Sequence, residues 1–234
     1  MSTIYLIRHG ENHANVTKEF SYKYVDYSLT PKGVLQAKQT AAYLQDKNIA
    51  ALYASPLKRA IETADIITTV LRLPVIIMEQ FRELNVGLLE GQPPSTHNWA
   101  IYAQVVNAWY TGRHDMAFPG GEDYVTLRDR TMNGLQEILS YQAGTCVALI
   151  GHGGIFTATI KDICLHVDLN TLLQRKKQNC SITEIEAYLV DGRVEGKLKA
   201  WASCSHLQGE AAQFISGSPL FEDEMVRVAS YQHP

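Results

Sequence analysis

Short apolar runs alternate with longer stretches of helical spacing along this chain. Runs of branched and apolar residues with strand length are typical of buried β-strands. They cover residues 3–7, 50–54, 75–78 and 147–150. Between them apolar residues recur every three or four positions, which predicts amphipathic helices packed against the strands. The chain therefore has the pattern of an α/β protein.

Capping residues place the starts of two of these helices. Thr30-Pro31 offers an N-cap hydroxyl followed by a proline in the first turn. Ser55-Pro56 has the same order, so Ser55 is predicted to cap the next helix. The residues between the first strand and Thr30, roughly 11–28, are polar and rich in tyrosine and are predicted to form a loop.

A hairpin is predicted near the end of the chain. Residues 181–187 alternate like a strand, and Asp191-Gly192 supplies a tight turn into a partner strand near residues 197–201. Alternating strands and helices require a mostly parallel sheet with helices on both faces. The predicted fold is a three-layer, doubly wound α/β sheet with an antiparallel hairpin at one edge.

Composition narrows the range of partners. The chain has 234 residues, 46% of them hydrophobic, with a formal net charge of −3, which suits one domain with a modest insertion. No large basic cluster supports nucleic-acid binding. No apolar stretch approaches the ~20 residues that cross a bilayer, so no membrane partner is expected. Four cysteines without a CxxC pair, and no leader pattern at the start, predict a cytoplasmic protein.

The candidate chemistry begins where the first strand ends, at Arg8-His9-Gly10-Glu11. Ligands bind at the carboxyl ends of the strands in open α/β sheets. Arginine matches two phosphate oxygens at once, and histidine can attack phosphorus through one ring nitrogen. Gly10 is expected to allow a sharp turn and close approach of the backbone to a bound group.

Other junctions carry residues of the same kind. Arg59 lies in the first turn of the helix that follows the second strand, where free N–H groups also favour an anion. Glu83 follows the third strand, and His152-Gly153 follows the fourth. Because the carboxyl ends of parallel strands share one edge, these residues are expected to converge on one phosphate site.

These motifs together resemble the histidine phosphatase superfamily, in its phosphoglycerate mutase-like branch. Beyond residues 8–11, the matched segments are Asn15, residues 28–30, Gly33, residues 36–37, 55–64, 81–91, 119–122, 147–154, 179–181 and 205–207. The resemblance implies one domain over residues 1–207, with a cap-like insertion at about 92–118 and a C-terminal extension at 208–234.

The resemblance also implies roles. His9 would be the nucleophile that forms a phosphohistidine, with Arg8, Arg59 and His152 as further catalytic groups. Glu83 would protonate the leaving group and later deprotonate water, and it is expected to be protonated in the free enzyme. The residues expected to bind the phosphate are Arg8, Asn15, Arg59, His152 and Gly153. Three positive charges would then surround the phosphate, so neither a metal nor a cofactor is expected.

Three functions are compatible with this resemblance. They are a phosphomonoesterase acting on a small phosphorylated metabolite with phosphate as product, a cofactor-dependent phosphoglycerate mutase, and a catalytically weak phosphate-binding protein. The mutase would carry a basic, proline-rich insertion after Glu83, whereas residues 92–99 are aromatic and poorly charged, which favours the phosphatase. Asn12, in place of the family's small hydroxyl residue, leaves the substrate open. The sequence also leaves open whether the chain forms a homodimer.

An aromatic segment allows two interpretations. Trp99, Tyr102, Val106 and Trp109 are spaced like one face of a helix. They either pack onto the domain or roof the phosphate pocket. In the second case Arg113 and His114 could meet a second anionic group of the substrate, and Tyr22 and Tyr24 could form the opposite wall.

Overall fold

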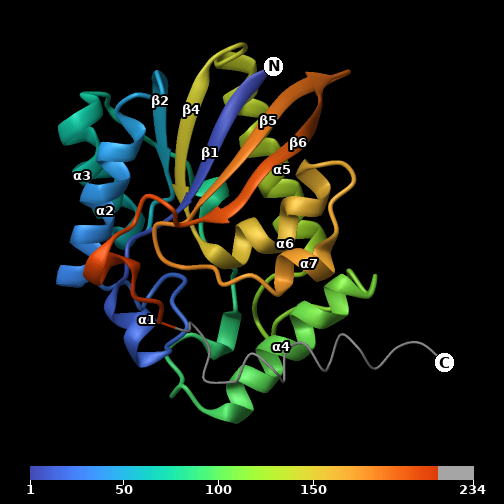
Figure 1. Cartoon of the computed structure of the whole chain (residues 1–234). Coiled ribbons are helices and arrows are strands. Elements are labelled where there is room, and N and C mark those ends of the chain that lie inside the picture. The colour runs from blue at the N-terminus through green and yellow to red at the C-terminus, as the bar shows by residue number, and fades with distance from the viewer. Residues whose placement is uncertain (216–234) are drawn as a thin grey trace.

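A six-stranded sheet crosses the computed structural model, which describes residues 1–215 (Figure 1). The strands are β1 Ser2–Arg8, β2 Ile49–Ala54, β3 Val75–Ile77, β4 Cys146–Gly151, β5 Ile182–Val190 and β6 Arg193–Ser203. Their order across the sheet is β3-β2-β4-β1-β5-β6, and β1 to β4 pair in parallel. The hairpin β5–β6 adds to β1 in the antiparallel sense, so the predicted fold class and edge hairpin are confirmed.

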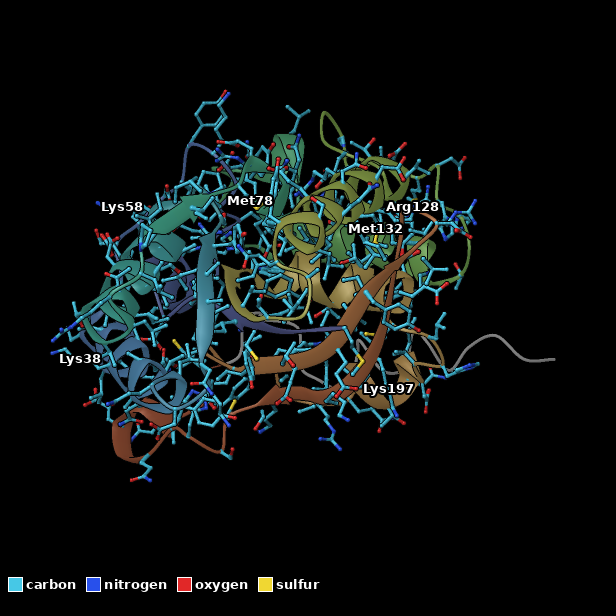
Figure 2. All side chains as sticks on the ribbon, turned by 90° about the horizontal axis from the view of Figure 1, so that it is seen from above. Lys38, Lys58, Met78, Arg128, Met132 and Lys197 are labelled. Atoms are coloured by element: carbon cyan, nitrogen blue, oxygen red, sulfur yellow. The ribbon has the colours of Figure 1, made fainter. Side chains whose placement is uncertain are left out.

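The inner strands are apolar on both sides because both faces of the sheet are covered. In β1, Ile4 and Leu6 face one apolar cluster while Tyr5 and Ile7 face another. The helices α2 Pro31–Leu44 and α3 Lys58–Leu71 cover the second face. The first face is covered by α5 Tyr124–Tyr141 and α6 Gly153–Ile163. Figure 2, seen from above, shows side chains filling the space on both sides of the sheet.

Smaller elements lie around this three-layer body. They are α1 His13–Thr17, α4 Thr96–Tyr110, α7 Leu169–Leu173 and the 3₁₀ turns Glu79–Phe81, Gly87–Leu89 and Gly209–Ala212. In Figure 1, α1 and α4 lie beyond the end of the sheet at which β1, β2 and β4 finish. The helix α1 was not predicted; it begins inside the expected polar loop because Asn12 caps it and its side chain accepts from Asn15 N.

One of the two predicted helix caps is wrong. Thr30 caps α2 and accepts from Gly33 N at 3.1 Å, as expected. The helix α3, however, begins at Lys58, and its N-cap Leu57 provides no side-chain hydrogen bond. The Ser55 hydroxyl accepts from Leu57 N and also bonds the ring of His152. A Ser-Pro pair is typical of a helix start, but here a tertiary partner holds the hydroxyl.

Gly10 allows two backbone segments to lie close together. A Cβ on Gly10 would lie 2.6 Å from Gly33 O, and one on Gly33 would lie 2.0 Å from Glu11 O. The two glycines therefore let the first turn of α2 press against the segment that follows β1. This differs from the expected role of Gly10, which was to bring backbone close to a bound group.

The start of the C-terminal extension packs on the domain. Ala211 is buried, and its carbonyl accepts from Gln36 Nε2 at 3.1 Å and from Gln178 Nε2 at 2.8 Å. The part of the extension at residues 216–234 lies outside the described residues. Within residues 1–215, every helix is too short or too polar to cross a membrane.

Candidate active site

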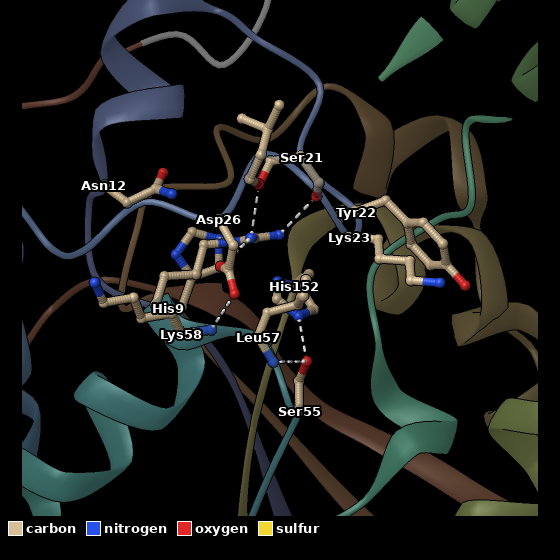
Figure 3. A network of polar contacts seen from close by, with 12 residues as sticks. His9, Asn12, Ser21, Tyr22, Lys23, Asp26, Ser55, Leu57, Lys58 and His152 are labelled. Atoms are coloured by element: carbon tan, nitrogen blue, oxygen red, sulfur yellow. Dashed lines mark hydrogen bonds and ion pairs between the residues drawn. The ribbon is translucent and has the colours of Figure 1, made fainter. Parts of the chain in front are cut away.

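The three residues expected at the core of the site meet at the carboxyl ends of adjacent strands. His9 follows β1, His152 follows β4, and Arg59 lies in the first turn of α3 after β2. The two imidazole rings have their centroids 5.2 Å apart, and all three side chains are buried. Figure 3 shows the two histidines next to each other, with Ser21 above and Ser55 below in that view.

The hydrogen bonds of His9 define its tautomer. Arg59 Nε donates to His9 Nε2 at 3.1 Å, and a guanidinium only donates. His9 Nε2 therefore carries the lone pair, and Nδ1–H donates to Gly10 O at 2.7 Å. An unprotonated ring nitrogen is what attack on phosphorus requires, and here its lone pair accepts a hydrogen bond from Arg59.

The surroundings of His9 keep this ring neutral. Burial lowers its pKa well below the usual value, and the positive charges of Arg59 and Arg8 lower it further. The ring that would attack phosphorus is thus unprotonated without the help of a general base.

The ring of His152 is neutral in this structure for the same reasons. Burial first, and then the nearby Arg59, lower the pKa of His152 well below its usual value. Its Nε2 is hydrogen-bonded to Ser55 Oγ at 2.7 Å, while Nδ1 is buried without a partner among residues 1–215. The expected set of three cations around a phosphate therefore consists here of two arginines and one neutral imidazole.

Arg59 is held by the segment that follows Phe20. Its Nη1 donates to Ser21 Oγ at 2.8 Å, and its Nη2 donates to Ser21 O at 3.0 Å. Asp26 Oδ1 lies 3.5 Å from Nη1, and Asp26 Oδ2 accepts from Lys58 N at 2.8 Å. Burial lowers the pKa of Arg59 to about 10, which leaves it charged at neutral pH. We call residues 21–26 the 21–26 loop.

Arg8 lies on the other side of His9. Its Nη1 donates to Lys177 O, while Nε is buried without a partner in the described part of the chain. Gly153 lies against this side chain, since a Cβ there would be 3.4 Å from Arg8 Nε. An unpaired, buried N–H on an arginine beside the nucleophile is suited to an oxygen atom of a bound anion.

The Glu83 carboxylate caps the amino end of α6. Oε2 accepts from Gly154 N at 3.0 Å, and Oε1 accepts from Ile155 N at 2.8 Å and from Leu84 N at 3.0 Å. A Cβ on Gly154 would lie 2.5 Å from Oε1, so this contact needs a glycine. Three backbone N–H groups therefore hold the Glu83 carboxyl at the amino end of α6, and the protonated Glu83 expected from the sequence stays a prediction.

An arginine–carboxylate pair fixes the segment that carries Glu83. Arg130 Nη1 donates to Gln80 O at 2.6 Å and to Arg82 O at 2.8 Å, and Nη2 donates to Glu83 O at 3.0 Å. The same guanidinium binds Glu122 in two places, and Glu122 Oε1 also accepts from Asn85 N at 2.8 Å. The backbone on both sides of Glu83 is therefore tied to one buried ion pair.

Asn15 is linked to His9 by hydrogen bonds through a second asparagine, Asn179. Its Oδ1 accepts from Asn12 N at 3.1 Å and from Asn179 Nδ2 at 2.9 Å. Asn179 Nδ2 also donates to His9 O at 3.1 Å. With its oxygen engaged, the Asn15 amide has its N–H₂ as the group left to donate. Asn12, which replaces the family's hydroxyl residue, is fully buried, and its Nδ2 has no partner within residues 1–215.

The aromatic segment packs on the domain. Trp109 is buried against Phe118, with ring centroids 5.3 Å apart, so this end of α4 packs on the domain. Tyr102 stacks on Phe20 at 5.5 Å, and burial followed by the Glu83 charge raises the pKa of its hydroxyl. The interpretation that this segment roofs the phosphate site stays a prediction.

The residues that follow α4, and the proposed opposite wall, have other surroundings. Arg113 is exposed, and His114 stacks on Tyr124 at 4.5 Å. Tyr24 is 83% exposed, and Tyr22 lies under the guanidinium of Arg82 at 5.7 Å. These contacts give no support to a second anion site at residues 113–114 or to a wall formed by Tyr24.

Several functional contacts were missed in the sequence. Ser21 and Asp26 hold Arg59, but each is a single polar residue in an irregular segment. Asn179 lies in the matched segment 179–181, but its contact with His9 O was not predicted. Only Arg130, placed six residues into α5 beside the matched Glu122, offered a signal, because a charge on the buried side of a helix requires a partner. Within residues 1–215, no group of three metal-binding side chains comes together.

Several known proteins are similar to this chain in sequence. A family model described as "Histidine phosphatase superfamily (branch 1)" matches residues 4–198. The "Uncharacterized phosphatase PhoE" of Bacillus subtilis is 32% identical over 164 residues, which are 70% of this chain and 78% of that protein. The "Probable phosphoglycerate mutase GpmB" of Proteus mirabilis is 31% identical over 193 residues, which are 80% of this chain and 85% of that protein.

A solved structure has the same fold. The structure of Bacillus stearothermophilus YhfR superimposes with a TM-score of 0.72 at 25% sequence identity. The match covers 88% of this chain and 99% of that one.

Proposed function

The chain belongs to the histidine phosphatase superfamily, and from this premise we propose that it is a metal-independent phosphomonoesterase with His9 as nucleophile. The family prediction made from the sequence is confirmed. The observation that carries the proposal is the neutral His9, whose Nε2 accepts a hydrogen bond from the buried Arg59 and whose pKa is lowered by burial and by the charges of Arg59 and Arg8. A small phosphorylated metabolite is the proposed substrate.

The first chemical step transfers the phosphoryl group to the protein. His9 Nε2 forms a bond to phosphorus while the bond from phosphorus to the ester oxygen breaks, and the proton of the Glu83 carboxyl goes to the leaving oxygen. Arg8 and Arg59 stabilise the charge on the equatorial oxygens. Asn15 and His152 complete the proposed phosphate site, together with the backbone at Gly153.

Before this step, a contact within the protein has to be replaced by a contact with the phosphate. Arg59 Nε donates to the attacking nitrogen in this structure, so the guanidinium must move from His9 Nε2 to a phosphate oxygen. The bound phosphate also favours the protonated carboxyl of Glu83, because two adjacent anions repel each other.

The second step releases the phosphate. Glu83, now a carboxylate, takes a proton from water as the water oxygen attacks phosphorus, and the bond to His9 Nε2 breaks. The products are inorganic phosphate, a regenerated neutral His9 and a protonated Glu83. The proton that Glu83 gave to the leaving alcohol is thus replaced by one from water.

The mutase remains the second candidate, because one relative carries that name. A mutase would return the phosphoryl group of His9 to a sugar acid instead of to water. The segment at residues 92–99 contains no lysine or arginine to hold a doubly phosphorylated intermediate, which supports the phosphatase. We further propose that residues 92–118, including α4, form a cap on a domain that spans residues 1–207.

One experiment separates these candidates. The protein is treated with excess EDTA and offered a panel of small phosphate esters that includes both phosphoglycerate isomers. We expect release of inorganic phosphate that EDTA does not reduce, and no release by His9→Ala. Interconversion of phosphoglycerates without phosphate release would establish the mutase, and EDTA loss reversed by one divalent ion would exclude this mechanism.

A further inference from the structure

A single carboxylate oxygen gathers four consecutive backbone N–H groups next to the proposed site. Glu90 Oε1 accepts from Tyr22 N at 2.7 Å, Tyr24 N at 2.9 Å and Val25 N at 3.1 Å, and also from Lys23 N. Successive N–H groups that point to one spot form a concave anion site. In this protein a side chain of the same chain, 65 to 68 residues further on, fills that site.

The two ends of this segment are the residues that hold Arg59. Ser21 precedes the four N–H groups and accepts two hydrogen bonds from Arg59. Asp26 follows them and lies 3.5 Å from the same guanidinium. Glu90 thus binds the middle of the 21–26 loop, and the two flanking residues orient the arginine that lies on His9 Nε2.

The loop also has contacts that do not involve Glu90: Ser21 Oγ donates to Val25 O, and Lys58 N donates to Asp26 Oδ2 at 2.8 Å. The side chains of Lys23 and Tyr24 are exposed and add no packing. Arg82 contributes a weaker tie, since its Nη1 donates to Tyr22 O at 3.3 Å. Hydrogen bonds to an ionised acceptor are about twice as strong as neutral ones. The carboxylate of Glu90 therefore contributes four hydrogen bonds, all charge-assisted, to holding the loop in this conformation.

We propose that Glu90 is a positioning residue of the phosphate site, which fixes the 21–26 loop so that Ser21 and Asp26 hold Arg59 beside His9. This inference rests on the proposed function. Glu90 does not touch the reacting atoms. Its effect on the reaction passes through the loop to the guanidinium, which is one of the two charges that meet the phosphate.

The chemistry of the contact provides a sharp test. Removing the carboxylate leaves four N–H groups around an empty anion site, and a small carboxylate can then fill it. Glu90→Ala is expected to lower kcat/KM for a phosphate ester by about ten-fold or more, the scale of misplacing one catalytic group. Added formate is expected to restore most of this loss. Glu137→Ala, which removes an exposed carboxylate that accepts from Gln80 Nε2 at 3.2 Å, should show neither effect.

A second comparison shows whether the effect passes through Arg59. In an Arg59→Ala background, Glu90→Ala should cause almost no further loss, because residues that act as a unit give non-additive effects. Full additivity of the two losses would overturn the inference. So would a loss in Glu90→Ala that formate leaves unchanged while the protein remains folded.

Hydrogen exchange tests the same contact without turnover. The amides of residues 22–25 should exchange slowly in the wild type, rapidly in Glu90→Ala, and slowly again with formate. If Glu90→Ala does not fold, Glu90→Gln keeps an acceptor oxygen without the charge, and it should show an intermediate kcat/KM. Wild type that hydrolyses no ester would refute the proposed function, whereas unprotected amides in wild type would refute the role of Glu90.

Discussion

Arg130→Gln should damage both stability and the placement of Glu83. The wild-type guanidinium joins the Glu122 carboxylate to the carbonyls of Gln80, Arg82 and Glu83. The Glu122 side chain is only 6% exposed, and that of Arg130 is 20% exposed. The substitution would leave a buried carboxylate without its cation.

The size of the effect follows from this burial. Removing one partner of a buried ion pair costs about 3–5 kcal/mol, because the remaining charge is left uncompensated. The free energies of the three hydrogen bonds from Arg130 to backbone carbonyls do not add in full, since these bonds hold the same segment. The partial exposure of Arg130 places the expected loss near the lower end, at about 3 kcal/mol.

A matched control lies on the same helix. Arg128 pairs with Asp129 at 2.7 Å, but their side chains are 36% and 55% exposed. Arg128→Gln should cost less than about 1 kcal/mol, the usual value of a surface pair. In urea unfolding, Arg130→Gln should lower the midpoint by about 1 M or more, and Arg128→Gln by a few tenths.

Catalysis adds a second measurement. Well below the unfolding midpoint, Arg130→Gln should slow alkyl phosphates more than aryl phosphates, because a displaced Glu83 protonates a poor leaving group less well. Arg130→Lys, which keeps the charge but loses the planar fork, should fall between the two. Equal midpoints for Arg130→Gln and Arg128→Gln would refute the reasoning about the buried pair.

Three further predictions concern single groups. His9→Ala should abolish turnover, and wild type denatured in alkali during turnover should carry phosphate that acid releases; turnover by His9→Ala would end the phosphohistidine mechanism. Glu83→Gln should slow alkyl phosphates by about 10²-fold and aryl phosphates less, so equal losses would argue against proton transfer. Burial lowers the pKa of His206 from 6.5 to about 4. As the pH falls across that range, the imidazole of the unfolded chain is protonated before that of the folded chain. The folded wild type therefore loses stability. His206→Gln should lose less over the same range, and an identical pH dependence would contradict this account.

The fold was predictable because it follows from local patterns that the sheet reinforces. Buried parallel strands are apolar on both faces, so β1 and β4 appear as continuous branched runs. The candidate site was predictable for a related reason. His9 and His152 come directly after a strand, and Arg59 lies in the first turn of the helix that follows β2. The sheet brings these strand ends together, regardless of the conformations of the intervening loops.

The groups that hold the site were not predictable in this way. Glu90 binds residues 22–25 through backbone N–H groups, which every residue but proline has, so the sequence contains no complementary signal. Ser55 shows the opposite error, since its local capping signal was strong but its hydroxyl bonds His152. Side-chain contacts between distant segments depend on the folded geometry, and hydrophobic spacing does not encode them.

In this structure, protein groups already form hydrogen bonds with several of the donors and acceptors that a phosphate would use. Arg59 donates to His9 Nε2 and to Ser21, and Glu83 occupies the amino end of α6, where an anion is favoured. A phosphate that enters must replace these bonds, so part of its binding free energy is offset by the contacts it breaks. The unpaired donors, Arg8 Nε and Asn12 Nδ2, lose no protein partner when the phosphate arrives. We therefore expect these two groups to bond a phosphate without breaking a protein contact, and Asn12→Ala should weaken phosphate binding even though the family usually has a hydroxyl at this position.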